Sequence, residues 1–288
     1  MGLYAMTKYY SVCNKIISLD APSFTTDLGD FGLFEVQPTQ ADVKVTCHIS
    51  ECLPPFHQNG KETESGITVS WQGNDVYRHT PMGIHEGALS HYNISDPTHI
   101  NVYFTHHSYT TFFHFRYLWS SVSLSQILLP FNILLFHASY ISHENKAILF
   151  SAPCGTGKST QAELWRIHKG AEVINGDKAG ISIDADGVNA HGLPFSGTSG
   201  ICKNRSMPLS AIVILGQAKE NRIRRLNGTE AIMCLMENIY LDFIAPGEMQ
   251  SCVDLLIEML KTVPVYRLDC TPDERAVKKL ADELKIGN

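Results

Sequence analysis

Hydrophobic and polar positions divide the chain into two differently patterned halves. Up to about residue 115, short stretches rich in β-branched and aromatic residues are separated by turn signals, which predicts strands. Beyond that point, apolar runs that suit buried strands alternate with stretches of helical spacing, which predicts an α/β arrangement. We therefore predict a β-rich accessory domain over residues 1–115 and an α/β domain over residues 116–288.

Three stretches of the first half have the clearest strand pattern. Residues 66–71 alternate and precede a turn, and residues 99–104 and 109–115 are rich in β-branched and aromatic side chains. The nine histidines between His48 and His114 have no recognised zinc spacing, which favours solvated or hydrogen-bonded imidazoles over a metal site. We interpret this half as a domain that shapes or presents a substrate.

The second half is organised around residues 146–160, KAILFSAPCGTGKST. An apolar run suited to a buried strand is followed by a glycine-containing turn and then by a helix start. Backbone N–H groups at such a turn, together with the positive end of the helix, bind phosphate. Lysine can then reach the β- and γ-phosphates while the next hydroxyl holds Mg²⁺. The predicted nucleotide-binding residues are Pro153, Cys154, Gly155, Thr156, Gly157, Lys158, Ser159 and Thr160.

This segment departs at one position from the phosphate-loop (Walker A) pattern G-x-x-x-x-G-K-[ST]. Ala152 stands where the first glycine is expected, and alanine suits that position only if its φ is negative. The alternative is an ordinary strand-to-helix turn with an exposed lysine. The run G-T-G-K-S-T in this context favours the triphosphate site.

Three further residues are candidates for the chemistry. Asp177 ends a buried strand, where a carboxylate can hold the water shell of a metal or accept a proton from an attacking hydroxyl. His137 lies on a strand expected beside the loop, and Arg205 follows a glycine- and serine-rich loop that can close over an acceptor. The alternatives are a turn-forming aspartate, a core histidine and a solvated arginine.

Composition narrows the class of protein. The chain has 288 residues, with 23 Lys and Arg against 29 Asp and Glu, and no large basic block, so nucleic-acid binding is not predicted. The longest apolar region, residues 127–136, is too short to span a bilayer, and the eight cysteines form no C-x-x-C pair. We expect a cytoplasmic protein with free thiols.

The order of motifs in the second half is similar to a known family. His137-Ala138-Ser139 is followed by SAPCGTGKST, ING with Asp177, LPFSGTSG, PLSAIVIL and VPVYRL. This order resembles the HPr-kinase-like family, which is related to ATP-dependent phosphoenolpyruvate carboxykinase, over roughly residues 115–288. The resemblance implies an α/β phosphate-loop kinase core that binds ATP and Mg²⁺, with Asp177 activating a serine hydroxyl.

Two differences from the bacterial HPr kinases affect the expected metal ligands and the expected acceptor. Their paired acidic residues appear here as Gly176-Asp177, so one metal-directed carboxylate is absent, and the first half of the chain does not resemble theirs, which argues against HPr as the acceptor. Diverged members of the family phosphorylate a serine of a ribosomal peptide, and this chain is similar to them in length and layout. The expected acceptor is therefore a hydroxyl of a peptide, a protein or a small molecule.

The resulting hypothesis is an ATP-dependent kinase of a serine-type hydroxyl. In this hypothesis Lys158 neutralises phosphate oxygens, and Ser159 and Asp177 bind Mg²⁺. Asp177 also takes the hydroxyl proton, and Arg205 stabilises the transferred group. His137 is the remaining candidate catalytic residue. The alternatives are a nucleotide-dependent regulatory module and a carboxykinase-type lyase, and self-association into a homo-oligomer is left open.

Overall fold

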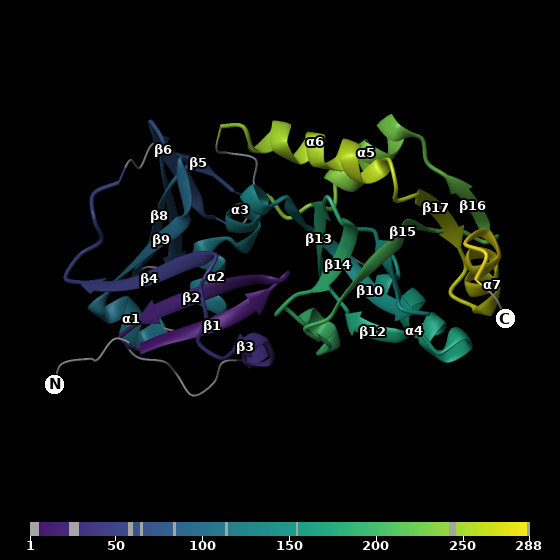
Figure 1. Ribbon diagram of the computed structural model, residues 1–288, viewed down its shortest axis with the longest axis horizontal. Helices are drawn as coiled ribbons and strands as arrows, with labels where there is room; N and C mark the ends of the chain where they lie inside the picture. Colours follow the sequence, from purple (N-terminus) through teal and green to yellow (C-terminus); the bar gives the residue numbers. More distant parts are fainter. Residues whose placement is uncertain are drawn as a thin grey trace. The chain divides into compact units, whose positions relative to one another are not determined.

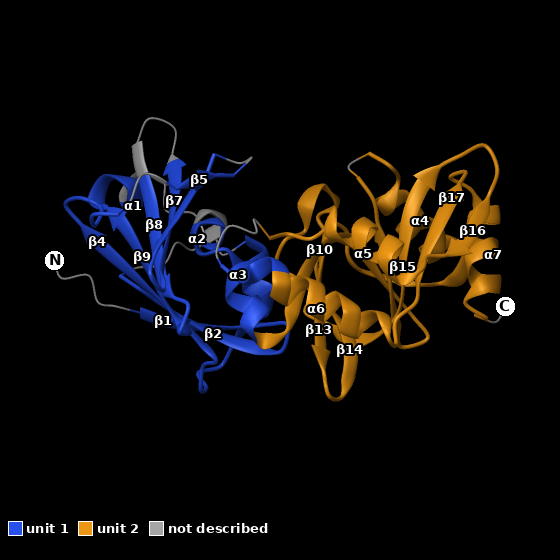
Figure 2. Ribbon diagram, turned by 90° about the horizontal axis from the view of Figure 1, so that it is seen from above, with its two compact units in different colours: residues 1–130, 242–249 blue, residues 131–241, 250–288 orange. Residues whose placement is uncertain are grey.

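The computed structural model describes residues 6–22, 29–56, 60–63, 66–82, 85–112, 115–153, 155–241 and 246–286. It is an α/β protein with two large mixed sheets. The chain forms two compact units, of which the first contains residues 1–130 with 242–249 and the second contains residues 131–241 with 250–288 (Figure 2).

The first unit is built on a nine-stranded sheet in the order β3-β1-β2-β4-β9-β8-β7-β6-β5 (Figure 1). One face carries the apolar core, in which Val45, Val102 and Phe104 are fully buried. The strands expected at 66–71 and 99–104 are present as β6 and β9. The strands are β1 Met6–Val12, β2 Lys15–Ala21, β3 Glu35–Val36, β4 Val43–Ser50, β5 Lys61–Glu62, β6 Thr68–Gln72, β7 Asp75–Met82, β8 His85–Asn93 and β9 Asp96–Thr105.

The strand expected over residues 109–115 is wrong where the structure describes it, because residues 109–112 and 115 lie in helices, while residues 113 and 114 lie outside the described residues. Helix α1 spans His106–Phe112 and contacts β4, β8 and β9. The Tyr109 ring lies edge-on to that of Phe104, with 5.8 Å between centroids. Packing of this aromatic side chain against the sheet outweighs the strand propensity of the local sequence.

Two further helices complete the first unit. Helix α2 spans Phe115–Val122 and contacts β7, β8 and β9, and α3 spans Leu124–Leu128. The Trp119 ring of α2 stacks on Phe31, which lies in the short 3₁₀ helix η1 (Gly29–Phe34), at 4.6 Å between centroids. The compact unit therefore continues to residue 130, whereas the sequence pattern placed the domain boundary at 115.

The second unit is built on an eight-stranded mixed sheet in the order β11-β10-β13-β14-β15-β17-β16, with β12 paired to β10. No helix in the described part of the chain is long and apolar enough to cross a membrane. The strands are β10 Ile133–His143, β11 Lys146–Ser151, β12 Glu172–Asn175, β13 Lys178–Asp184, β14 Gly187–Gly192, β15 Ser206–Gln217, β16 Arg222–Arg225 and β17 Val265–Cys270. The helices are η2 Leu129–Phe131, which joins the units, η3 Gly197–Ser199, α4 Lys158–Lys169, α5 Gly228–Met236, α6 Glu248–Leu260 and α7 Glu274–Glu283.

The parallel strands β11, β15 and β17 direct the loops that follow them to one edge of this sheet. Helices α4 and α7 cover one face, where Trp165, Phe150 and Leu280 belong to a common apolar core. At the shared edge, Gln217 Nε2 at the end of β15 donates to the Gly155 carbonyl after β11, at 3.3 Å. The loop after β11 is therefore attached to the neighbouring parallel strand.

Strand β15 curls the sheet because its two halves have different neighbours. Its first residues pair with β14, and its later residues pair with β11 and β17. His191 on β14 is 1% exposed and lies between two hydroxyls, with Nδ1 2.7 Å from Ser206 Oγ and Nε2 2.9 Å from Ser182 Oγ. Burial lowers its pKa to about 4.

His191 should make the second unit less stable in mild acid. An unfolded histidine titrates near pH 6.5, so between about pH 6.5 and about pH 4 the unfolded chain binds more protons than the folded one, and stability falls as the pH falls. We expect a loss of roughly 2 kcal/mol between pH 7 and pH 5 from this residue. Urea unfolding should show a smaller pH dependence for His191→Gln and the wild-type pH dependence for the control His168→Gln, which alters a partly exposed side chain near the end of α4. An unchanged pH dependence in His191→Gln contradicts this assignment.

Candidate functional site

The loop between β11 and α4 has the backbone geometry expected of a ligand-binding turn. Gly155 and Gly157 have φ of 77° and 116°, which only glycine adopts without strain. A Cβ added at either position would meet no atom within 4 Å, so the loop is open on the side of these glycines. Cys154 lies outside the described residues. Gly157 also precedes α4, whose first amide groups are directed toward the loop.

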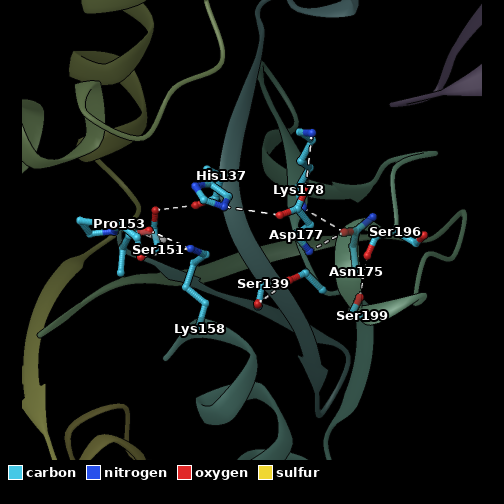
Figure 3. Close-up of polar contacts among 12 residues, drawn as sticks. His137, Ser139, Ser151, Pro153, Lys158, Asn175, Asp177, Lys178, Ser196 and Ser199 are labelled. Atoms are coloured by element: carbon cyan, nitrogen blue, oxygen red, sulfur yellow. Dashed lines mark hydrogen bonds and ion pairs between the residues drawn. The ribbon is translucent and has the colours of Figure 1, made fainter. Parts of the chain in front are cut away.

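Lys158, the first residue of α4, reaches back into this loop. Its side chain is 8% exposed, and Nζ donates to the Ala152 carbonyl at 2.8 Å and approaches the Pro153 carbonyl at 3.4 Å (Figure 3). Ala152 is fully buried and is not among the residues with positive φ, so the condition for alanine in place of glycine is met. Ser159 and Thr160 are exposed in the first helical turn.

Asp177 lies one strand away from the loop, at the corner where β12 ends and β13 begins. Ala138 on β10 donates its N–H to the Asp177 carbonyl at 3.0 Å, and on its other side it pairs with Ser151 at the end of β11. Two strand spacings therefore separate the backbones of Ser151 and Asp177, roughly 10 Å. Figure 3 shows His137 between the loop residues and Asp177.

Hydrogen bonds from neighbouring polar groups hold the backbone between β12 and β13 in place. The buried Asn175 side chain accepts hydrogen bonds from the N–H groups of Asp177 and Lys178, both at 2.9 Å, and donates to the Leu193 carbonyl. Ser139 Oγ donates to the Gly176 carbonyl at 2.8 Å. A Cβ on Gly176 would lie 2.1 Å from Ser199 Oγ, so the close approach of the 196–200 loop excludes a larger residue. This contact accounts for the glycine at position 176.

Two cationic or hydrogen-bonding side chains engage the Asp177 carboxylate. His137 Nε2 lies 3.4 Å from Oδ1, and Lys178 Nζ lies 3.5 Å from Oδ2. The hydrogen bond from His137 is the main cause that lowers the pKa of Asp177, the positive charge of Lys178 adds to it, and partial burial opposes it. Asp177 is therefore ionised at neutral pH and can only accept hydrogen bonds.

Gly197 packs closely against the Asp177 side chain. Its φ is 57°, and an added Cβ would lie 2.6 Å from the Asp177 Cβ, whereas Gly200, with φ of 66°, has no atom within 4 Å of such a Cβ. Gly200→Ala should cost about 1–2 kcal/mol for the left-handed backbone alone. Gly197→Ala should cost about 1–3 kcal/mol more because of the clash. Equal losses in urea unfolding would show that Gly197 does not confine Asp177.

The structure does not bring Arg205 to this group of residues. Its guanidinium is ion-paired with Glu172 at the start of β12, and Lys203 Nζ binds the same carboxylate at 2.8 Å. Lys203 is the main cause of a lowered pKa at Glu172, and Arg205 adds to it. Among the predicted residues, His137, Lys158 and Asp177 therefore come together, and Arg205 is occupied elsewhere.

A comparison with protein families gives a match over most of the second half of the chain. The model described as "SynChlorMet cassette protein ScmC" covers residues 117–279, which is more than half of the chain and includes both the loop and Asp177. The chain belongs to the ScmC family. The ScmC region extends from α2 to α7, so it contains the whole second-unit sheet with its loop and the Asp177 corner.

Other comparisons add little to the ScmC assignment. The structure of the HPr(Ser) kinase/phosphatase from Coxiella burnetii is similar over 53% of this chain and 96% of that one, with 11% identity and a TM-score of 0.31. Such a likeness is at most a distant relation in fold and carries no information on activity. A comparison with curated proteins gave no match.

Sequence reasoning missed several residues around Asp177. Lys178 follows Asp177 directly, but nothing in the pattern shows that its ammonium group lies near two aromatic rings, those of Phe195 and Tyr240. Asn175 was detectable in principle, because Asn-Gly-Asp is a turn signal in which the asparagine side chain binds backbone N–H groups. The two rings are distant in sequence and give no local signal.

Two side chains of the site, Ser159 and Asp177, have the chemistry to hold the Mg²⁺ of a bound nucleotide. Within the described ranges, no group of three His, Cys, Asp or Glu side chains is placed to hold a metal ion. Mg²⁺ in nucleotide sites takes most of its ligands from phosphates and water and needs only one or two protein groups. The exposed hydroxyl of Ser159 and the ionised Asp177 have the chemistry for that purpose.

Proposed function

We propose that the protein is an ATP-dependent kinase that transfers the γ-phosphoryl group to a serine-type hydroxyl. The observation that carries this proposal is the placement of Lys158 and its loop on one side of Ala138 and Asp177 on the other. A phosphate held at the loop and a hydroxyl held at Asp177 can then meet between them. Phosphoryl transfer needs positioning and charge stabilisation more than covalent chemistry from the protein, and these residues supply both.

The loop would bind the donor. Gly155 and Gly157 leave open space for phosphate oxygens near the backbone N–H groups, and the start of α4 adds the positive end of the helix dipole. Lys158 would exchange its bonds to the Ala152 and Pro153 carbonyls for phosphate oxygens. Ser159 would hold Mg²⁺, which neutralises charge on the β- and γ-phosphates.

Asp177 would act on the acceptor. As the bond forms between the hydroxyl oxygen and the γ-phosphorus, the bond from that phosphorus to the oxygen of the departing ADP breaks, and Asp177 receives the hydroxyl proton. Because its pKa is low, Asp177 chiefly orients the hydroxyl until the oxygen becomes acidic late in transfer. His137 would hold the carboxylate through Oδ1, so that Oδ2 can bind the acceptor hydroxyl as well as Lys178.

Arg205 has no part in this proposal. Its guanidinium is ion-paired with Glu172, a carboxylate that Lys203 also binds, and Lys178 is the cation that lies at Asp177.

The experiment that tests the function measures ADP release with Mg²⁺, ATP and a panel of hydroxyl acceptors, which includes serine peptides, proteins and free serine. A kinase predicts ADP release that rises with the concentration of one acceptor and saturates. Nucleotide binding with the same slow hydrolysis whatever the acceptor contradicts the kinase and favours a regulatory nucleotide site.

A further inference from the structure

Lys178 lies in an environment that its pairing with Asp177 does not explain. Its ammonium nitrogen is 4.5 Å from the centroid of the Tyr240 ring and 5.1 Å from that of Phe195, besides the 3.5 Å contact with Asp177 Oδ2. The two rings come from separate segments, the one after β14 and the one after α5. Three parts of the second unit therefore converge on one ammonium group at the proposed acceptor side.

The rings hold the ammonium group without cancelling its charge. An aromatic face attracts a cation through its quadrupole, but it carries no net charge. Asp177 contacts Lys178 through Oδ2 and His137 through Oδ1. A lysine has three N–H donors, and the side chain of Lys178 is 24% exposed, so it can reach an incoming anion.

We infer that Lys178, Phe195 and Tyr240 form a subsite for a carboxylate that the acceptor carries beside its reacting hydroxyl. The inference rests on the proposed kinase function and names the class of its substrate. A hydroxyl bonded to Asp177 and a carboxylate bonded to Lys178 would have their oxygens less than about 10 Å apart. That distance suits an acidic side chain one or two residues from the serine, or the α-carboxylate of a terminal serine.

The surrounding residues support this orientation of the acceptor. Tyr240 is 38% exposed, and its ring also lies edge-on to His137 at 5.9 Å, so it borders both Lys178 and the residue that holds Asp177. Apolar walls with one cation and one hydrogen-bond acceptor are typical of pockets that orient a small polar group. In Figure 3, Lys178 and Lys158 lie on opposite sides of the contact between His137 and Asp177, so the carboxylate would bind away from the phosphates.

The experiment compares matched peptides in two separate measurements. Serine peptides carry either glutamate or glutamine beside the serine, and a second pair ends in serine with a free or an amidated carboxyl group. Fluorescence anisotropy gives the Kd of each peptide, and intact mass gives its phosphorylation rate. The wild-type protein should bind the carboxylate member of at least one pair on the order of tenfold more tightly.

Variants separate recognition of the acceptor from support of Asp177. Lys178→Met keeps the side-chain length between the rings and should remove the preference, so that both members of a pair bind equally weakly. Lys178→Arg should retain the preference. Lys203→Met, which removes a surface cation that binds Glu172, is the matched control and should behave as wild type.

The outcomes distinguish this subsite from the kinase function itself. Loss of the binding preference in Lys178→Met supports the subsite, even if no peptide gains phosphate and the kinase function fails. Wild-type protein without a preference, or Lys178→Met with the wild-type preference, overturns the subsite even if serine is phosphorylated.

Discussion

Asp177→Asn is expected to lower the rate of phosphoryl transfer by about 10²–10⁴-fold while leaving the affinity for ATP nearly unchanged. The amide has almost the same shape, but it cannot take the hydroxyl proton and it removes the negative charge that His137 and Lys178 engage. ATP would bind one strand away, at the loop, so its contacts should persist. The measurement is single-turnover transfer to acceptor together with calorimetric titration of ATP.

The matched control is Asp186→Asn, which alters an exposed carboxylate in the turn between β13 and β14. It should transfer phosphate at the wild-type rate. Full activity in Asp177→Asn, or an equal loss in both variants, would remove Asp177 from the mechanism.

Lys158→Met is expected to weaken both ATP binding and transfer. Loss of one charged hydrogen bond to phosphate corresponds to an affinity change of roughly 10–100-fold. Transfer should fall by a further 10²–10³-fold or so, because the same cation stabilises charge that develops on the transferred group. Titration of ATP and single-turnover transfer at saturating ATP separate the two effects.

Two controls accompany this variant. Lys146→Ala removes an exposed lysine at the start of β11, the strand before the loop, and should leave both properties unchanged. Because Lys158 also bonds the Ala152 and Pro153 carbonyls, urea unfolding must show that the variant remains folded. A folded Lys158→Met protein with wild-type ATP affinity would contradict the proposed phosphate site.

The elements around the loop were predictable because their signals are local. An apolar run, two glycines and a helix-forming stretch lie next to one another in sequence, and the structure forms β11, the loop and α4 at those positions. The same holds for the strand that leads to Asp177. The required negative φ at Ala152 followed from simple stereochemistry and is met.

The remaining features depend on residues far apart in sequence. Helix α1 forms where β-branched and aromatic residues favour a strand, because the helix packs on the sheet of the first unit. Local propensity takes no account of such packing. Gly176 has no room for a side chain because Ser199 lies close to it, and Arg205 forms an ion pair with Glu172. Neither contact can be predicted from the spacing of residues in the sequence. Side-chain partners across a folded sheet therefore limit what sequence reasoning can predict about this site.

The most direct test of phosphoryl transfer between the loop and Asp177 is intact-mass spectrometry of the acceptor after incubation with the protein, Mg²⁺ and ATP. Wild-type protein should add about 80 Da, the mass of one phosphoryl group on a hydroxyl. Asp177→Asn should add none in the same time, although ATP still binds. A phosphorylated acceptor that appears equally with both proteins, or ATP binding by wild type without a modified acceptor in the whole panel, would contradict the account.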